Sequence, residues 1–127
     1  MAVELINAGP PARGPYAAAT LATGTRVLTI SGALAEDENG DVVGGDDPEA
    51  QARQCLKNID SVLRSVGATK NDVVRIGVFL TSMADRPAVQ RARIEYFGSH
   101  TPAATLVQIS ALVLPEFKVE IEAMAIL

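Results

Sequence analysis

Residues 47–67 read DPEAQARQCLKNIDSVLRSVG, and this segment predicts an amphipathic helix. Three start signals agree at its beginning: an N-cap candidate, a proline suited to the first helical position and an acid in the first turn, namely Asp47, Pro48 and Glu49. Apolar residues then recur at three- and four-residue spacing, at Ala52, Cys55, Leu56, Ile59, Leu63 and Val66, and Gly67 is a typical helix stop. We predict a helix over residues 48–66 in which Cys55 lies on the buried stripe and packs as a small hydrophobe.

The segments on both sides of this helix alternate between strand-like runs and turn residues. Six apolar runs are strand candidates: residues 1–7, 16–22, 26–31, 73–80, 103–110 and 118–126. The sequence Thr23-Gly24-Thr25 joins the second and third runs and favours a β-hairpin between them. The fourth run, VVRIGVFL, has little polar interruption, as expected of a strand that is covered on both faces.

A second helix is predicted between the fourth and fifth runs. Asp85 is its cap candidate, Gly98 is its stop, and its buried side is marked by Val89, Ala92, Tyr96 and Phe97. The resulting order of elements fits one α+β domain over residues 1–127, a single sheet with two helices on one face. Apolar side chains on the other face need cover as well, and for so short a chain we expect another subunit to provide it.

Composition excludes several classes of function. The chain has 127 residues and 48 % hydrophobic content, which is enough for one core, and its net charge of −4 leaves no basic excess for phosphate contacts with nucleic acid. No apolar run is long enough to span a membrane, and the first ten residues lack the apolar stretch of a signal peptide. We therefore expect a cytoplasmic protein with neither a nucleic-acid nor a membrane partner.

Metal and cofactor sites also lack their usual residues in this sequence. Cys55 is the single cysteine and His100 the single histidine, so one chain cannot form a multi-thiolate or a two-histidine metal site. Gly44-Gly45 lies in an acidic segment and lacks the lysine of a phosphate-binding loop. We predict no metal and no cofactor, and we interpret His100 as a solvated loop residue.

Two glutamates stand out in the last strand candidate. Glu120 and Glu122 alternate with Ile121 and Ala123, so both carboxylates should point to the same face of the sheet. Most such pairs belong to a solvated strand face. This strand is very apolar, however, and a carboxylate buried in it would need a partner, so Glu120 is a candidate functional residue.

Several motifs, in order, resemble the Rid family, the reactive-intermediate deaminases of the RidA type. The matching segments run nearly end to end: Gly14-Pro15-Tyr16, Ser31-Gly32, Gln51-Ala52-Arg53-Gln54 through Asn58, Val78-Phe79-Leu80, Pro102-Ala103 and residues 119–123. The resemblance implies a chorismate-mutase-like fold, a homotrimer, and small-molecule ligand sites between neighbouring subunits. Within such a site it implies Tyr16, Ser31 and Glu120 as catalytic residues, with Gly32 beside them.

The same resemblance implies that several site positions have changed chemically. The family's arginine after the Pro-Ala pair clamps a substrate carboxylate; here that position is Ala104, and a methyl group cannot replace a bidentate guanidinium. Altered side chains also occupy the other positions that the resemblance assigns to substrate binding: Ala18, Ala33, Gln90 and Leu106. We expect a less polar pocket that suits a larger and less charged ligand than a short 2-imino acid.

Three hypotheses for the function follow. The first is an enzyme of a specialised biosynthetic pathway that hydrolyses, tautomerises, dehydrates or cyclises a reactive imine, enamine or carbonyl metabolite, with Glu120 as acid/base. The second is a non-catalytic ligand-binding or regulatory member. The third is a ribonuclease or translation inhibitor, which the acidic net charge disfavours. Little hydrolysis of 2-aminoacrylate-derived imines is expected unless Arg91 or Arg93 replaces the missing clamp.

Overall fold

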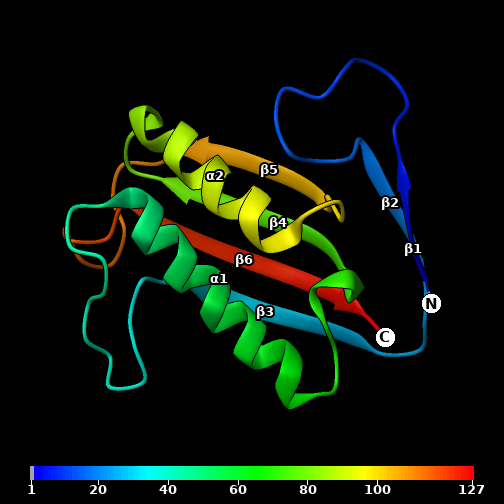
Figure 1. Ribbon diagram of the computed structural model, residues 1–127, viewed down its shortest axis with the longest axis horizontal. Helices are drawn as coiled ribbons and strands as arrows, with labels where there is room; N and C mark the ends of the chain where they lie inside the picture. Colours follow the sequence, from blue (N-terminus) through cyan, green and yellow to red (C-terminus); the bar gives the residue numbers. More distant parts are fainter. Residues whose placement is uncertain (1) are drawn as a thin grey trace.

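The computed structural model describes residues 2–127 and divides them between two sheets and two main helices (Figure 1). The elements follow in the order β1 (Ala2–Ile6), β2 (Ala19–Thr23), β3 (Val27–Ala33), α1 (Pro48–Ser65), β4 (Val73–Leu80), α2 (Arg86–Phe97), β5 (Ala103–Gln108) and β6 (Val119–Ile126). Both helices pack on one face of a mixed sheet of order β3-β6-β4-β5, in which β4 and β5 run parallel and the other neighbours antiparallel. The predicted α+β class, with both helices on one face of a sheet, is confirmed.

Helix α1 begins and ends where the sequence signals place it. The Asp47 carboxylate accepts hydrogen bonds from Glu49 N at 3.0 Å and Ala50 N at 3.3 Å, which satisfies two of the N–H groups that a helix start leaves free. Gly67 follows the last turn with a φ of 75°, a conformation that carries no Cβ penalty for glycine. The predicted range of 48–66 is confirmed to within one residue.

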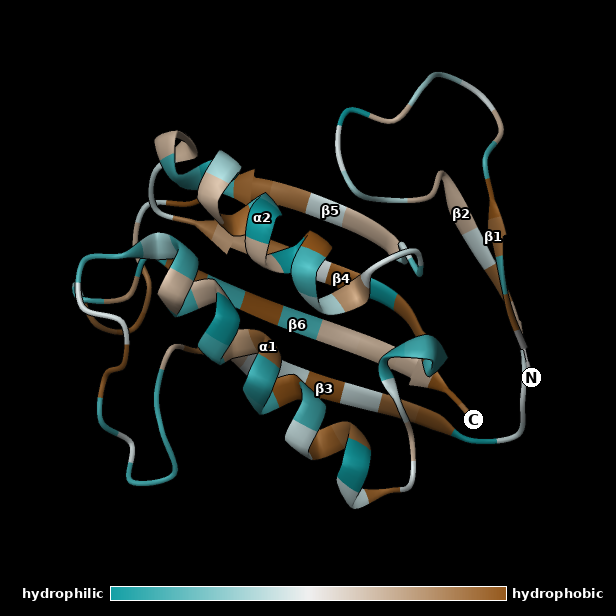
Figure 2. Ribbon diagram, viewed as in Figure 1, coloured by the Kyte–Doolittle hydropathy of each residue, from teal (hydrophilic) through white to brown (hydrophobic). Residues whose placement is uncertain are grey.

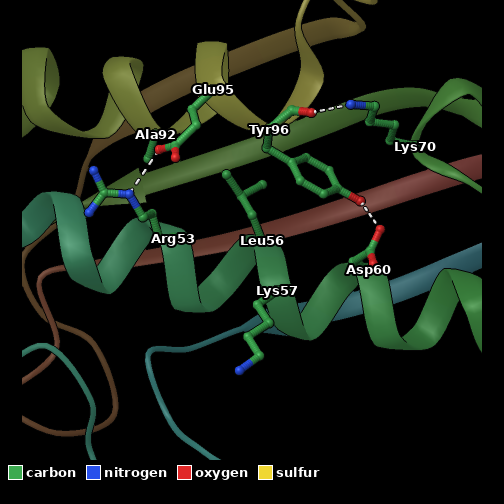
Figure 3. A pocket seen from close by; sticks show the side chains of 8 residues that line it. All are labelled: Arg53, Leu56, Lys57, Asp60, Lys70, Ala92, Glu95 and Tyr96. Atoms are coloured by element: carbon green, nitrogen blue, oxygen red, sulfur yellow. Dashed lines mark hydrogen bonds and ion pairs between the residues drawn. The ribbon is translucent and has the colours of Figure 1, made fainter.

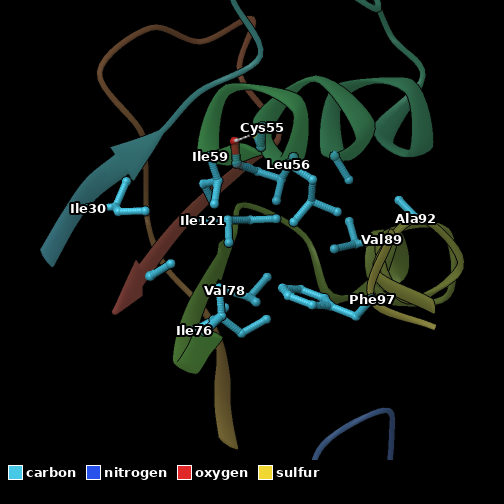
Figure 4. Close-up of a cluster of buried hydrophobic side chains, with 14 of the residues drawn as sticks. Ile30, Cys55, Leu56, Ile59, Ile76, Val78, Val89, Ala92, Phe97 and Ile121 are labelled. Atoms are coloured by element: carbon cyan, nitrogen blue, oxygen red, sulfur yellow. Dashed lines mark hydrogen bonds between the residues drawn. The ribbon is translucent and has the colours of Figure 1, made fainter. Parts of the chain in front are cut away.

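The hydrophobic core lies between the four-stranded sheet and the two helices (Figure 4). Buried side chains from α1, α2, β4 and β6 meet there, among them Leu56, Ile59, Ile76, Val78, Val89, Phe97 and Ile121. Burying a large apolar side chain of this kind contributes roughly 1.5–3 kcal/mol. Cys55 has no exposed surface in this core, and burial raises the pKa of its thiol to about 12. The prediction that Cys55 packs as a core residue is confirmed.

Hydropathy follows the layers of the fold (Figure 2). Strand β4 is hydrophobic along most of its length, whereas both helices mix hydrophilic and hydrophobic residues. In β6 the two faces alternate: Val119, Ile121, Ala123 and Ala125 are buried toward the helices, and Glu120, Glu122, Met124 and Ile126 are half-buried on the opposite face. We call that opposite face of the sheet the open face. Glu120 and Glu122 therefore share one face, as their alternation predicts.

The N-terminal strands differ from the prediction. Strand β2 pairs antiparallel with β1 and not with β3, so the predicted hairpin through Thr23-Gly24-Thr25 is wrong. The reason lies at the C-terminus, because Thr25 N and Arg26 N both donate to Leu127 O at 2.9 Å and hold this segment against the end of the chain. The six strands form a four-stranded and a two-stranded sheet (Figure 1) instead of the single sheet expected from the sequence.

Two predictions about loops are corrected as well. Asp85 makes no capping hydrogen bond at the start of α2; in the turn before it, the Ser82 hydroxyl accepts from Ala84 N at 3.3 Å. His100 is half-buried and not solvated, since its Nε2 lies 2.8 Å from Val73 O. A carbonyl oxygen only accepts hydrogen bonds, so Nε2 carries the proton. His100 therefore ties the loop before β5 to the start of β4.

Candidate functional site

A cavity of about 410 Å³ opens between β5, α2 and the segment that precedes β2. It brings together four residues that the sequence singled out: Tyr16, Gln90, Ala104 and Leu106. Its other lining residues are Arg13, Met83, Arg86, Arg93 and Thr105. We call this space the arginine cavity.

Backbone contacts hold Tyr16 in the arginine cavity. Its hydroxyl oxygen accepts a hydrogen bond from Arg13 N at 3.0 Å. The next residue, Ala17, is buried and forms a parallel bridge with Ala103 at the start of β5. The phenol is thus anchored beside the strand that lines the cavity, and its O–H proton is available to a ligand.

Arg93 is the most deeply buried cation of the arginine cavity. Only 3 % of the residue is exposed, its Nη2 makes one long contact of 3.4 Å with Pro15 O, and its buried Nε has no partner among residues 2–127. Burial and the neighbouring Arg86 lower the pKa of the Arg93 guanidinium to about 10, so it is still charged at neutral pH. None of the described residues that line this cavity is acidic. Arg93 therefore carries a buried charge without a carboxylate partner.

Arg86 and Gln90 form the cavity wall beside Arg93. Arg86 Nη2 donates to Arg13 O at 2.6 Å. With its amide oriented to satisfy both groups, the Gln90 side-chain oxygen accepts from Arg86 Nη2 at 3.2 Å and from Arg86 Nε at 3.1 Å. Both partners of Arg86 are neutral oxygens, so its positive charge also remains uncompensated.

Helical spacing explains which arginines of α2 line the cavity. Arg86, Gln90 and Arg93 stand at positions i, i+4 and i+7, and they therefore share one face of the helix. Arg91 lies on another face, where its Nε donates to Glu49 Oε1 at 2.7 Å. Of the two arginines considered as a replacement clamp, the structure brings Arg93 and not Arg91 to the cavity. The same spacing is the sequence signal that identifies Arg86, which the family motifs alone miss.

Three other predicted residues lie on the far side of the sheet. The Glu120 side chain, on β6, passes directly over Gly32 on β3, because a Cβ at Gly32 would lie 1.9 Å from Glu120 Oε2. Glycine is thus what leaves room for this carboxylate. Ser31 and Gly32 fall in a register shift of β3, an irregularity of the kind that re-aims side chains near functional sites. We call Ser31, Gly32 and Glu120 together the glutamate face.

The two glutamates of β6 differ in their partners. Arg75 Nη1 donates to Glu122 Oε2 at 3.1 Å, so Glu122 is neutralised by a neighbour on β4. Glu120 forms no ion pair with any of the residues 2–127. Glu120 is therefore the carboxylate of the open face whose charge is left for a ligand or a proton.

The remaining two predicted positions, Ala18 and Ala33, lie in spaces next to these two regions. Ala33 borders a groove of about 410 Å³ along β3, with Ser31, Gly32 and Asn58. Ala18 lines a smaller space of about 270 Å³ that shares Tyr16 with the arginine cavity. The structure thus distributes the predicted site residues over two regions and their borders.

One chain cannot bring the arginine cavity and the glutamate face together. Ala104 and Leu106 pack against the core on the helix side of the sheet. Glu120 lies on the open face, and β4 separates its strand from β5. A ligand site that uses both regions has to combine two copies of the chain.

A family model described as Endoribonuclease L-PSP matches residues 6–127 of this chain. The chain is 39 % identical to the 3-aminoacrylate deaminase RutC of Acinetobacter baylyi over 116 residues, which are 91 % of this chain and 90 % of that protein. Its fold is similar to that of YyfB, a protein of the conserved Rid family from Yersinia pestis, with a TM-score of 0.90 and 36 % identity over 100 % of both chains. YyfA of the same organism and family gives a TM-score of 0.74 and 36 % identity over 98 % of this chain and 99 % of its own. The chain belongs to the Rid family.

Membership of the Rid family confirms the resemblance drawn from the motifs and gives residue 104 its significance. The motifs place the carboxylate-binding arginine of Rid proteins there, and in this chain Ala104 contributes a methyl group to the cavity wall. Arg93 reaches the same cavity from α2. A less polar pocket than in relatives with the arginine stays a prediction, and three guanidinium groups line the cavity in this chain.

A separate groove of about 420 Å³ lies between α1 and α2 (Figure 3). Three contacts join the charged and polar groups along it: Arg53 Nε with Glu95 Oε2 at 2.8 Å, Tyr96 O–H with Asp60 Oδ1 at 2.6 Å, and Lys70 Nζ with Tyr96 O at 2.7 Å. Burial and the hydrogen bond to Asp60 raise the pKa of Tyr96. None of the residues predicted for the Rid site lines this groove. We interpret it as a structural contact between the helices.

Across residues 2–127, no three His, Cys, Asp or Glu side chains are grouped so that they could hold a metal ion. In the same part of the chain, neither helix has the length and apolar character that crossing a bilayer requires.

Proposed function

We propose that this chain is a Rid-family enzyme that hydrolyses a reactive imine or enamine, with Glu120 as acid/base, in a site formed between two subunits of a homotrimer. The observation that carries the proposal is the environment of Glu120. Its carboxylate occupies the space that Gly32 leaves free, on the open face and without a counterion among the described residues, whereas Glu122 is paired with Arg75. An uncompensated, half-buried carboxylate can accept a proton and return it.

Imine hydrolysis needs a group that moves protons between water and nitrogen. In the proposed reaction a water oxygen forms a bond to the imine carbon while Glu120 takes a proton from that water. Glu120 then returns this proton to the nitrogen, which gives a carbinolamine. It next takes the hydroxyl proton of the carbinolamine and delivers it to the nitrogen as the C=O bond forms and the C–N bond breaks, so the products are a carbonyl compound and ammonia. An enamine enters the same route after a proton adds to its carbon. No electrons are gained or lost, so the reaction needs no oxidant or reductant.

The assembly supports this chemistry because each subunit supplies one half of the site. The arginine cavity and Tyr16 would come from one subunit, and Glu120 and Ser31 from its neighbour. The opposite faces of these two regions favour such a shared site over one within a single chain. The similarity to a relative named 3-aminoacrylate deaminase supports an ammonia-releasing reaction.

Ammonia release from freshly generated 3-aminoacrylate and from 2-aminoacrylate-derived imines tests the proposal. We expect turnover by the wild-type protein with at least one of these compounds, and a loss on the order of 10²- to 10⁴-fold in Glu120→Gln. Glu122→Gln is the matched control, since it changes the same residue type on the same face. Equal rates in both variants and the wild type would exclude Glu120 as the acid/base. Ligand binding without turnover in the wild type would instead favour a non-catalytic member.

A further inference from the structure

We propose that Arg93, assisted by Arg86, is the anion clamp of the arginine cavity and binds the carboxylate group of a small substrate, the task that Ala104 cannot perform. The claim that the bound anion is a substrate rests on the proposed function, but the claim that Arg93 binds an anion does not. Substrates of this chain would then be short imino or enamino acids. Arg93 would determine specificity without belonging to the family motif.

The first argument is the unmet demand of a buried cation. Proteins rarely bury a guanidinium without a carboxylate or several good acceptors, because the charge loses its hydration. Arg93 has one long contact and a buried Nε that donates to nothing among residues 2–127. A ligand anion in the cavity supplies the partner that the chain itself does not.

The second argument is the geometry of the guanidinium. Its Nε and one Nη form two parallel donors that match the two oxygens of a carboxylate. In Arg93 the buried Nε has no partner among residues 2–127, and Nη2 makes only the 3.4 Å contact with Pro15 O. Arg86 adds a second positive charge in the same cavity while its own donors are held by Arg13 O and Gln90.

The third argument is the shape and polarity of the remaining wall. Opposite the cations the cavity is lined by apolar groups from β5 and the turn before α2, namely Ala104, Leu106 and Met83. The small side chain of Ala104 leaves space that an arginine at that position would fill. A volume of about 410 Å³ lies near the lower end of the range for small-molecule sites. These features suit a short, compact organic acid.

Binding of pyruvate and of inorganic phosphate, measured by titration calorimetry, distinguishes a carboxylate clamp from a phosphate site. We expect pyruvate to bind the wild-type protein and to bind Arg93→Met on the order of 10- to 100-fold more weakly. Arg93→Lys keeps the charge but not the two-donor fork and should lose an intermediate amount. Arg91→Met is the matched control on the same helix and should bind pyruvate like the wild type, because Arg91 contacts Glu49.

The Nε–H signal of Arg93 in nuclear magnetic resonance spectra gives a readout that needs no variant. We expect it to shift as pyruvate is added to the wild-type protein, and this result stands even if Arg93→Met fails to fold. Equal pyruvate affinity in wild type and a folded Arg93→Met, or an unchanged Nε–H signal, overturns the proposal. Tighter, Arg93-dependent binding of phosphate overturns the carboxylate assignment. The acid/base assignment fails if Glu120→Gln keeps full ammonia release, whereas the clamp fails on the pyruvate results for Arg93→Met, so the two failures are separate results.

Discussion

The arginine cavity and the glutamate face belong to the same sheet but concentrate opposite charges. In the cavity, Arg86 and Arg93 are held by backbone and amide oxygens and meet no carboxylate. On the open face, Glu120 extends over a glycine and meets no cation of residues 2–127, although Glu122 beside it is paired with Arg75. Each region therefore provides one charge that a polar substrate needs and lacks the other. Under the proposed function, substrate binding and proton transfer would belong to different regions of the chain, and different substitutions should remove each of them.

The largest expected effect comes from recombining these two regions between subunits. Glu120→Gln and Arg93→Met should each be nearly inactive as pure oligomers. In randomly mixed trimers, about one quarter of the sites pair an intact cavity from one variant with an intact Glu120 from the other. We expect activity in mixtures, made by joint refolding, to rise to about that fraction of the wild type.

The alternative outcome is that the mixtures show only the summed activities of the two pure variants. That result would contradict a site shared between subunits and would place both regions in one site within a single chain. Native mass spectrometry of the same samples confirms that mixed trimers have formed. The control is each variant refolded alone under the same conditions.

The next effect should come from the glycine under Glu120. In Gly32→Ala the new Cβ would lie 1.9 Å from Glu120 Oε2, so the carboxylate has to move. A misplacement of about 1 Å in a catalytic group can cost about 10²-fold in rate, and we expect a loss of that order in ammonia release. Pyruvate affinity should change much less than this rate, because the substitution leaves Arg93 and Arg86 in place.

Gly77→Ala provides the matched control for this prediction. Its Cβ would lie 2.9 Å from Glu122 Cγ, so it disturbs the neighbouring glutamate in the same way. We expect ammonia release by Gly77→Ala to stay close to that of the wild type. Similar losses in both variants would indicate a general distortion of the sheet and not a role of Glu120.

The sequence predicted those parts of the molecule whose determinants are local. Helix α1 follows from its N-cap aspartate, its proline and its apolar spacing, and the structure places its ends within one residue of the prediction. The side shared by Glu120 and Glu122 follows from strand alternation alone. The pairing of β2 with β1 instead of β3 depends on bonds from residues 25 and 26 to Leu127, at the opposite end of the sequence. No local pattern contains that information.

The candidate site shows the same division. Family motifs identified Tyr16, Gln90 and Glu120, because those residues stand at recognisable positions. They did not identify Arg86 as a cavity residue, since it becomes relevant only when α2 packs beside β5 and the segment before β2 closes over it. The substitution at Ala104 predicted a less polar pocket, and no local pattern indicated that Arg93 of α2 would line the same cavity as Ala104.

A smaller effect, confined to stability, is expected at the cap of α1. Asp47→Ala removes the acceptor for Glu49 N and Ala50 N and should lower the free energy of unfolding by about 1 kcal/mol. Asp47 borders neither the arginine cavity nor the glutamate face, so pyruvate affinity and ammonia release should not change. Thermal denaturation and both binding assays on the same sample test this. A loss of activity here would mean that the assays report general stability.

The smallest expected effect is a pH dependence that belongs to the arginine cavity alone. Arginine ordinarily has a pKa of 12.5, but burial and Arg86 lower the pKa of Arg93 to about 10, so half of the Arg93 side chains lose their charge near pH 10. Pyruvate affinity should therefore fall about twofold between pH 8 and pH 10 and further above pH 10.

The free energy of unfolding should change in the opposite direction and rise with pH in this range. Because the unfolded chain keeps this proton up to 12.5, it binds more protons than the folded chain above pH 10, and the cost of burying Arg93 is relieved as the pH rises. Arg93→Met should lack this rise in stability, measured by denaturant unfolding at pH 9 and pH 10.5. A constant pyruvate affinity up to pH 10.5 would mean that the guanidinium that binds the anion keeps its charge to that pH, and the affinity of Arg93→Met then decides whether that guanidinium is Arg93.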